Sequence, residues 1–336
     1  MESNKIMQDR LRRINVRHDL IEIAKLIELC FGDVLDESGR AAIREMRMMS
    51  RAGPFLWLMS LFPIGNPSWQ YGFVYVSSGL IVGNIGAQPI NSTMNTWLIA
   101  NVAVHPDYRR QGIARQLVIA ALDSIESRGA TRVILQVDID NTDAASLYRQ
   151  IGFETLTIRT IWRRRSKHVT EHTSFQAPMK IRQALRADWP LEYSLLDKYS
   201  PEGLTWTAPL QIKHLRPSIL RDIGHFITGN QEERWLILRF GEVVGWVYIL
   251  SSSSTADQIR WVVAPPWRSA LEHELLKYAL NRLGDSNCNV WIEHPDGDAN
   301  RFLHQHFFES TRTLRWMHID LPYESQKVHR LSLELH

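Results

Sequence analysis

The sequence has little cysteine and no long apolar run. Only two cysteines, Cys30 and Cys288, occur in 336 residues, which is too few for a disulfide framework and typical of a reducing compartment. The longest apolar stretch, Pro54 to Pro63, is far shorter than the roughly 20 residues that cross a bilayer. The opening residues, MESNKIMQDRLRR, have no apolar core, so no secretory signal is predicted. These absences predict a cytoplasmic protein without a membrane partner.

An excess of one charge and a cluster of metal ligands are lacking too. The formal net charge is +3, and the basic residues are mostly dispersed. They show neither interleaved aromatic residues nor a known motif, so no nucleic-acid partner is predicted. The histidines are scattered and have no acidic or cysteine cluster beside them, so no metal is predicted. The composition is that of an ordinary globular protein, and its length favours two domains.

What the sequence does contain is an apolar strand followed by a basic turn and a helix. The run WLIANVAVHP from Trp97 predicts the strand, and apolar residues at three- and four-residue steps after Ala114 predict a helix that Gly129 ends. The turn between them, RRQGIA, starts at Arg109. It leaves several backbone N–H groups unpaired at the positive end of the helix dipole, where a phosphate or pyrophosphate binds. Gly112 lets such a ligand come close to the main chain.

A second strand and helix follow directly. Thr131 to Val137 is rich in β-branched residues and predicts a strand. Asn141 or Thr142 can cap the next helix, and Gly152 ends it. A basic glycine-containing turn also occurs in many α/β proteins that bind no ligand, so the second unit decides how the first is interpreted.

Together the two units resemble a known family. The spacing is Arg109-x-x-Gly112-x-Ala114, then Asn141-x-x-Ala144-x-x-Leu147-Tyr148-x-x-x-Gly152-Phe153. It is similar to the two signature motifs of the GNAT superfamily, the acetyl-CoA-dependent N-acetyltransferases. The resemblance implies acetyl-CoA as co-substrate and an amine as acceptor, either a small molecule or a peptide.

The resemblance also implies a binding site. The backbone N–H groups of the turn would bind the CoA pyrophosphate, the preceding strand would pair with the pantetheine arm, and Asn141 would hydrogen-bond that arm. The implied CoA-binding residues are Val102, Ala103, Val104, Arg109, Arg110, Gln111, Gly112, Ile113, Ala114, Arg115, Asn141, Ala144 and Tyr148.

Tyr148 is the candidate catalytic residue. When an amine attacks a thioester, the leaving thiolate needs a proton. A phenol of pKa about 10 is protonated at neutral pH, and its pKa is close enough to the roughly 8.5 of a thiol to share its proton with the thiolate. The alternative is a helix tyrosine that only packs in the core. No general base is assigned. Members of the superfamily that acetylate protein N-termini often carry a glutamate where this chain has Gln136; Asp138, Asp140 and His105 are other groups nearby.

The second half of the chain repeats the first in weakened form. The matching segments are Val16-Arg17 with Ile181-Arg182, Gly79–Gly83 with Gly241–Gly245, Val104–Pro106 with Ala264–Pro266, and Phe153–Thr155 with Phe308–Ser310. The predicted domains are 12–172, with intact CoA motifs, and 178–322. In the second domain the turn Trp267–Leu271 has no glycine, Asp296 replaces Asn141, Leu303 replaces Tyr148 and Phe307 replaces Gly152. We expect that domain to be GNAT-like but not catalytic.

The predicted fold class is α+β, a tandem GNAT fold in which each half is a mixed, mostly antiparallel sheet flanked by helices. Before the motifs, the pattern predicts a strand at Ile14–Arg17, helices at Asp19–Phe31 and Glu37–Arg51, and a hairpin of Tyr71–Val76 with Leu80–Ala87. Candidate acceptor-pocket walls, which could equally be core, are Phe31, Trp57, Met59 and Phe62. The predicted function is transfer of an acetyl, or another short acyl, group from acyl-CoA to a primary amine by direct attack; the alternative is a non-catalytic CoA-binding sensor or scaffold. The sequence leaves the oligomeric state open.

Overall fold

The computed structural model of the chain describes residues 10–32, 71–91, 95–165, 179–200, 212–219, 229–252, 256–284, 289–295 and 299–323, with a few single positions between these ranges. The chain forms two compact units that are not contiguous in sequence. Unit 1 comprises Met1–Leu156 and Arg315–His336, and unit 2 comprises Thr157–Leu314. Two long strands, β6 (Glu154–Arg164) and β12 (Phe308–Asp320), therefore contribute residues to both units. The predicted domains 12–172 and 178–322 describe the sequence repeat and remain a prediction. The two compact units have different boundaries from these domains.

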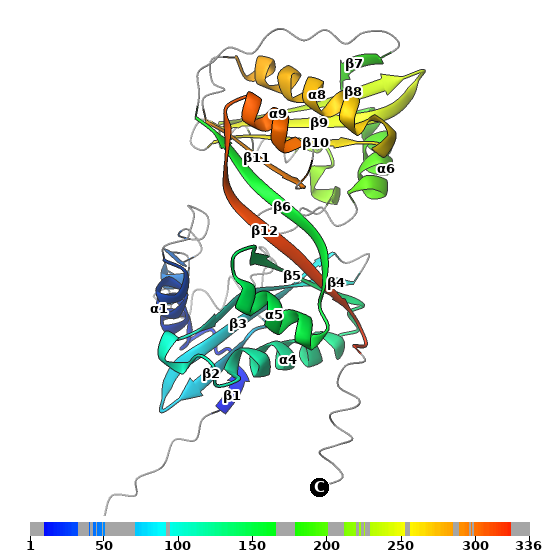
Figure 1. Cartoon of the computed structure of the whole chain (residues 1–336). Helices are drawn as coiled ribbons and strands as arrows, with labels where there is room; N and C mark the ends of the chain where they lie inside the picture. The colour runs from blue at the N-terminus through cyan, green and yellow to red at the C-terminus, as the bar shows by residue number, and fades with distance from the viewer. Residues whose placement is uncertain are drawn as a thin grey trace, which may run out of the picture. The chain divides into compact units, whose positions relative to one another are not determined.

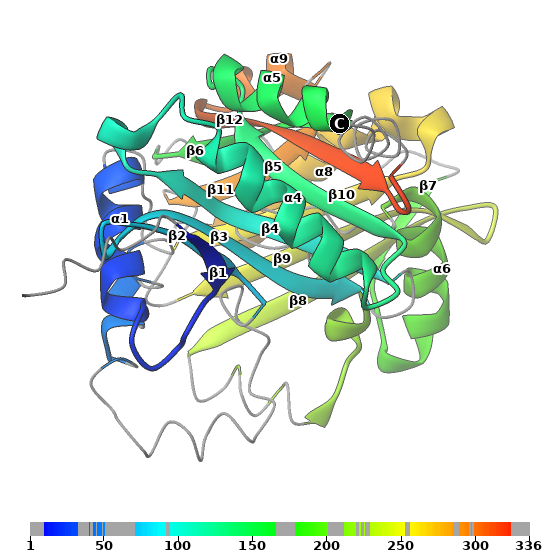
Figure 2. The same cartoon turned by 90° about the horizontal axis from the view of Figure 1, so that it is seen from below.

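The sheet of unit 1 runs in the order β1-β2-β3-β4-β5-β12 (Figures 1 and 2). Its strands are β1 (Arg10–Arg13), β2 (Phe73–Ser77), β3 (Leu80–Asn91), β4 (Thr96–Val104), β5 (Arg132–Asp138) and the second half of β12. Neighbours from β1 to β4 are antiparallel, and β4 with β5 is parallel. The helices are α1 (Leu20–Phe31), α4 (Ile113–Glu126) and α5 (Thr142–Ile151).

Apolar periodicity places these helices on the sheet. One cluster joins the buried side of α4 and α5 to alternate residues of the strands, among them Val133, Leu135 and Val137. A second cluster buries Ile23, Ala24 and Ile27 of α1 with Val74 of β2. Since successive strand side chains point to opposite faces, α4 and α5 cover one face of the sheet and α1 packs on the other.

The strand predicted at Ile14–Arg17 was wrong, because β1 lies at Arg10–Arg13. The reason is Asp19, which accepts two hydrogen bonds from Arg12 (2.5 and 2.9 Å) and one from the backbone N–H of Asn15 (2.7 Å). This carboxylate pulls residues after β1 into a turn that starts α1.

The other elements predicted for the first half agree with the structure where it is described. The helix predicted at Asp19–Phe31 is α1, and the predicted hairpin is β2 and β3, with Ser78 and Gly79 at positive φ in its tight turn. The predicted join at 166–178 and the pocket residues Trp57, Met59 and Phe62 lie outside the described residues, as does most of the helix predicted at Glu37–Arg51. Phe31 packs against the α1 core cluster.

The last strand of the chain completes unit 1. Asp320 of β12 pairs with Arg132 of β5 (2.6 Å), and the backbone N–H of Leu321 donates to the carbonyl of Thr131 (2.9 Å). Met317 and Ile319 belong to the core cluster beneath α4 and α5. A segment far along the sequence thus fills the place beside β5.

This assignment of β12 can be tested by core truncation. We expect Met317→Ala to lower the free energy of unfolding by about 2–5 kcal/mol, because it leaves a cavity in a fully buried site. Chemical denaturation of the full chain, followed with and without acetyl-CoA, measures the effect. The exposed Met48 supplies the control, and Met48→Ala is expected to cost little. An equal effect of both substitutions would contradict the placement of β12 in this core.

The strands of unit 2 run in the order β12-β6-β11-β10-β9-β8-β7. Its further elements are β7 (Met179–Gln183), α6 (Trp189–Tyr199), β8 (Asn230–Arg239), β9 (Glu242–Ser252), β10 (Asp257–Val263), α8 (Arg268–Leu283), β11 (Val290–Pro295) and α9 (Ala299–Gln305). Again one pair, β10 with β11, is parallel. The tandem α+β prediction is confirmed.

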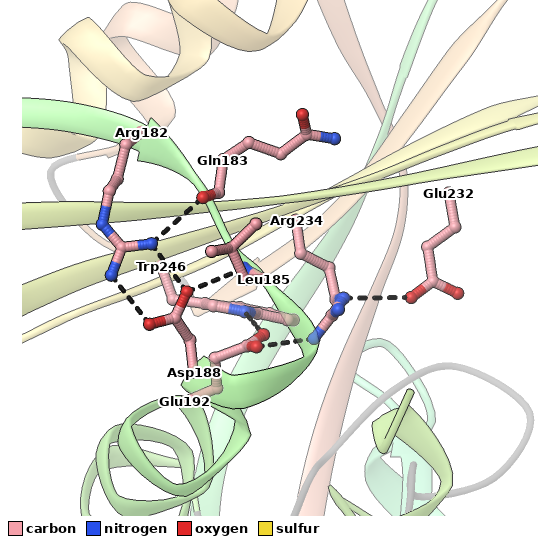
Figure 3. Close-up of polar contacts among 8 residues, drawn as sticks. All are labelled: Arg182, Gln183, Leu185, Asp188, Glu192, Glu232, Arg234 and Trp246. Carbon is pink, nitrogen blue, oxygen red and sulfur yellow. Dashed lines mark hydrogen bonds and ion pairs between the residues drawn. The ribbon is translucent and has the colours of Figure 1, made fainter. Parts of the chain in front are cut away.

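A repeated ion pair supports the internal repeat. Asp188 accepts from Arg182 (2.6 and 2.8 Å) and from the backbone N–H of Leu185 (2.7 Å), as Asp19 does in unit 1 (Figure 3). In both units the aspartate ties the first strand of the repeat to the start of its first helix. Among the described residues no helix is both long and apolar enough to cross a membrane.

Candidate active site

The candidate site of unit 1 begins where two parallel strands part. Pairing of β4 with β5 extends from Thr96 and Arg132 to Ile99 and Leu135. The strands themselves continue to Val104 and Asp138, so their carboxyl ends lie beside one another without a shared ladder. Such an opening between parallel strands gives an extended ligand access to backbone hydrogen-bonding groups.

A β-bulge lies at this opening. Gly86 pairs with Ala100 and Asn84 pairs with Ala103, so two residues of β4 stand opposite one residue of β3. Asn101, inside the bulge, has φ of 54°, a conformation that asparagine tolerates better than most residues. The buried Asn84 donates from Nδ2 to the carbonyl of Asn101 (3.0 Å) and so stabilises the bulge. A bulge turns backbone groups out of the ladder.

The turn after β4 has the geometry of an anion site. A short 3-10 turn, η2 (Pro106–Tyr108), leads to Arg110 at φ 63° and to Gly112 at φ 76°. Gly112 precedes the first residue of α4 and supplies no side-chain cap, so the first N–H groups of the helix have no acceptor within it. A Cβ added at Gly112 would meet nothing within 4 Å. The residues therefore fit a diphosphate approaching the helix N-terminus.

Side chains around the turn reinforce its shape. Arg109 Nε donates to the carbonyl of Val104 (3.2 Å), which also accepts from the thiol of Cys30 (3.4 Å). Arg110 pairs with Asp143 in the first turn of α5 (2.8 Å), and both side chains are exposed. The carbonyl of Val104 is thus already used, so a ligand pairing with β4 would meet mainly the bulge residues before it.

Asn141 caps α5. Its Oδ1 accepts from the backbone N–H of Ala144 (3.1 Å), so its Nδ2 group is the part left to donate to a ligand. Gly152, at φ 114°, ends the same helix, and its N–H donates to the carbonyls of Tyr148 and Arg149. The cap and the stop predicted from the sequence are both observed.

Tyr148 points into the core between α5 and the sheet. Its side chain is 6% exposed and lies edge-on to Phe153, with ring centroids 5.8 Å apart. Burial raises the pKa of the phenol above its usual value, so the group stays protonated at neutral pH. Both interpretations of this residue, proton donor and core side chain, are compatible with its position.

The candidate bases are not equivalent. His105 accepts the backbone N–H of Asp107 at Nδ1 and caps η2, which gives it a structural role. The Oε1 atom of Gln136 is buried and has no partner in the described part of the chain. Among described residues, no group of three or more His, Cys, Asp or Glu side chains is placed to hold a metal ion.

Unit 2 shares the parting of the parallel strands, since pairing of β10 with β11 stops at Gln258 and Trp291, but its described residues lack the bulge and the left-handed turn. Pairing of β9 with β10 runs without a shift from Leu250 and Gln258 to Gly245 and Val263, so there is no bulge in this described segment. Trp267, before α8, has φ of −112° rather than a left-handed conformation. Leu303, in the place of Tyr148, is fully buried. Asp296, predicted in the place of Asn141, lies outside the described residues.

Aromatic side chains occupy the end of the parallel pair in unit 2. Trp261 of β10 lies against His294 of β11, with ring centroids 4.9 Å apart, and 6.4 Å from Phe302 of α9. Phe302 stacks on His273, whose Nε2 is 2.9 Å from that of His306. Burial and the neighbouring His273 lower the pKa of His306 to about 4, so this pair is neutral at physiological pH. These rings leave the strand ends covered by the unit's own side chains.

The parted strands, the bulge and the open turn of unit 1 form an opening and an anion-binding turn in one unit. A family model described as acetyltransferase (GNAT) family matches residues 42–153. Ribosomal protein bS18-alanine N-acetyltransferase of Escherichia coli is 31% identical over 109 residues, which is 32% of this chain and 72% of that protein. The chain therefore belongs to the GNAT acetyltransferase family.

Solved structures show that the similarity in fold extends over both units. A GCN5-related N-acetyltransferase from Sphaerobacter thermophilus has a TM-score of 0.60 at 15% identity, covering 93% of this chain and 95% of its own. A tandem GNAT protein from the clavulanic acid biosynthesis pathway has a TM-score of 0.52 at 14% identity, covering 93% and 98%. At these identities the comparison establishes the tandem fold alone.

Proposed function

We propose that unit 1 binds acetyl-CoA, or another short acyl-CoA, and transfers the acyl group to a primary amine. The observation that carries this proposal is the combination, in one unit, of a bulged β4 parted from β5 and an open left-handed turn at Gly112. The first would accept the pantetheine arm and the second the pyrophosphate. The proposed CoA-binding residues are those named from the sequence.

The proposed reaction is direct attack. The amine nitrogen bonds to the thioester carbon, the carbon–sulfur bond breaks, and the thiolate takes a proton from Tyr148, which regains one from the ammonium through solvent. Backbone N–H groups at the bulge would polarise the carbonyl. Holding the two reactants together supplies much of the rate, since well-oriented pairs gain about 7–11 kcal/mol. We assign no general base.

A second candidate is a CoA-binding sensor or scaffold that does not turn over. Two observations favour it: Gln136, which cannot take a proton, stands where a base is expected, and Tyr148 is packed in the core. Unit 2 is proposed to be non-catalytic, because its strand ends are covered by aromatic rings and its helix start has no left-handed turn.

The acceptor is proposed to be a peptide or a small molecule with a primary amine. Support for a peptide comes from the Escherichia coli relative, whose name gives an alanine of a ribosomal protein as its target.

A calorimetric titration with acetyl-CoA, followed by a thiol-release assay with amines and short peptides, tests this function. We expect one binding site per chain and release of CoA thiol only when an acceptor is present. Binding without release for every acceptor would favour the sensor. Two sites would contradict the assignment of unit 2, and no binding would contradict the proposal altogether.

A further inference from the structure

A row of polar side chains crosses one face of the unit 1 sheet at the level of the bulge. It consists of Asn84 on β3, Gln136 on β5 and Trp316 on β12, and is called the polar row below. Successive side chains of a strand point to opposite faces of the sheet. Gln136 precedes the core residue Val137 on β5, and Trp316 precedes the core residue Met317 on β12. They therefore face away from α4 and α5.

Asn84 lies on the same face. It pairs with Val74 of β2, and Val74 packs in the cluster beneath α1. Directly paired residues of neighbouring strands point to the same face. The face of α1 thus carries all members of the polar row.

The register places the row across neighbouring strands. Asp320 pairs with Arg132, and Leu321 bonds to Thr131, so β12 runs antiparallel to β5. Counting back from the Asp320–Arg132 pair puts Trp316 across from Gln136. On the other side, continuing the β4–β5 register beyond Ile99 and Leu135 brings Gln136 to Ala100, the residue before the bulge. The row therefore flanks the place where the acyl group would lie.

Each member of the row has a buried polar atom without a partner among the described residues: Asn84 Oδ1, Gln136 Oε1 and Trp316 Nε1. Asn84 is 2% exposed and Trp316 is fully buried. An unpaired buried polar atom costs about 1–3 kcal/mol, and most such atoms in native proteins find partners. An occupant that hydrogen-bonds to the row would remove this cost.

In unit 2 the residue that corresponds to Asn84 has a hydrogen-bond partner. In the repeat, Gly245-Trp246 corresponds to Gly83-Asn84, and Trp246 Nε1 donates to Glu192 Oε2 (2.9 Å), which lies beside Arg234 (Figure 3). There the polar atom has an internal partner. In unit 1 the Oδ1 atom of the corresponding Asn84 has no such partner among the described residues.

We propose that the polar row is the acceptor subsite and that it recognises an amine with a carbonyl group next to it. Two amide oxygens, of Asn84 and Gln136, accept hydrogen bonds from the amine. The indole N–H of Trp316 donates to the neighbouring carbonyl. A peptide N-terminus or an amino-acid amide carries both groups, whereas a simple alkylamine or polyamine lacks the carbonyl. This inference rests on the proposed acetyl transfer and specifies its substrate class.

The inference also gives the end of the chain a function. Trp316 belongs to Arg315–His336, the C-terminal part of unit 1. The second repeat would therefore supply a side chain that selects the acceptor for the first.

The test follows the indole N–H resonances of the full chain by NMR in the presence of CoA. Trp316→Phe identifies the signal of Trp316 by its loss. We expect that signal to shift when alanine amide or an alanyl dipeptide amide is added and to stay in place with butylamine. If the Trp316 resonance does not shift on addition of either amide, the inference is overturned. Because binding is read directly, this arm does not depend on turnover.

Kinetics supply the second arm. We expect Trp316→Phe to raise KM for the amide acceptors about tenfold, with kcat and the Kd for acetyl-CoA little changed. Trp162→Phe is the matched control, since Trp162 is another buried tryptophan whose Nε1 has no partner among described residues, but it lies in unit 2. Equal effects of the two substitutions, or an unchanged KM in Trp316→Phe, would overturn the inference.

The two proposals fail separately. If Trp316→Phe has no selective effect while acetyl transfer still needs Tyr148, the acceptor subsite is wrong and the enzyme assignment stands. If the wild-type chain releases no thiol with any acceptor but the Trp316 signal shifts with the amides, the row binds such ligands and the acetyl-transfer mechanism is wrong. Gln136→Met, which keeps volume and removes the acceptor oxygen, checks the row if Trp316→Phe does not fold.

Discussion

Gly112→Glu is expected to abolish binding of acetyl-CoA, lowering the affinity at least 100-fold in calorimetry. Gly112 has φ of 76°, and a Cβ there would meet no protein atom within 4 Å. The substitution therefore adds no internal clash and costs about 1–2 kcal/mol of backbone strain. The new side chain would instead occupy the space before the N-terminus of α4 and bring a negative charge to the proposed pyrophosphate site. A 100-fold loss corresponds to about 2.7 kcal/mol.

Gly241→Glu is the control that separates the effect of backbone strain from the loss of the proposed pyrophosphate site. Gly241 has φ of 87° in the turn between β8 and β9, and a Cβ there would also meet nothing within 4 Å. We expect this variant to lose similar stability and to keep its affinity for acetyl-CoA. If Gly112→Glu binds acetyl-CoA as the wild type does, the turn before α4 is not the pyrophosphate site.

Tyr148→Phe is expected to lower kcat for acetyl transfer by about 10²–10⁴-fold, the range found for removal of a general acid. The ring stays in its contact with Phe153, so the Kd for acetyl-CoA and the stability should change little. The raised pKa of this buried phenol predicts that it stays protonated up to alkaline pH. Single-turnover thiol release at saturating acetyl-CoA measures the effect.

Tyr248→Phe is the control, because Tyr248 is a buried tyrosine of unit 2, stacked on Trp246. It should leave kcat unchanged. If Tyr148→Phe is as active as the wild type, Tyr148 is a core side chain and another group protonates the thiolate. If neither Tyr148→Phe nor the wild type transfers acetyl while acetyl-CoA still binds tightly, the sensor is the better description.

The sequence predicted the site best where local conformation decides it. The basic turn, the cap at Asn141 and the stop at Gly152 depend on residues close in sequence, whose propensities are specific. The periodicity of α1 and α4 likewise follows from one buried face. The strand at Ile14–Arg17 was misplaced because a side chain farther on, Asp19, binds Arg12 and sets the turn.

The sequence did not predict the polar row, because no single residue or local motif indicates it. Asn84 and Trp316 belong to separate repeats and are ordinary strand residues in their local context. Only the register of β3, β4, β5 and β12 brings them to one face and one level. The register also reveals the bulge: Ala100–Val104 of β4 stand opposite one residue fewer of β3, whereas Arg260–Val263 of β10 pair with Gly245–Tyr248 without a shift.

By itself the sequence determined the family motifs, the tandem α+β fold and the elements that carry the phosphate turn, because hydrophobic period, glycine and capping residues act over a few positions of the chain. Tertiary structure decided which strand stands beside β5, where the bulge lies and which polar atoms remain unpartnered. Pairing between distant strands depends on the free energy of the whole sheet and on which side chains its faces bury. That choice placed the final strand, with Trp316, in the unit that holds the proposed site.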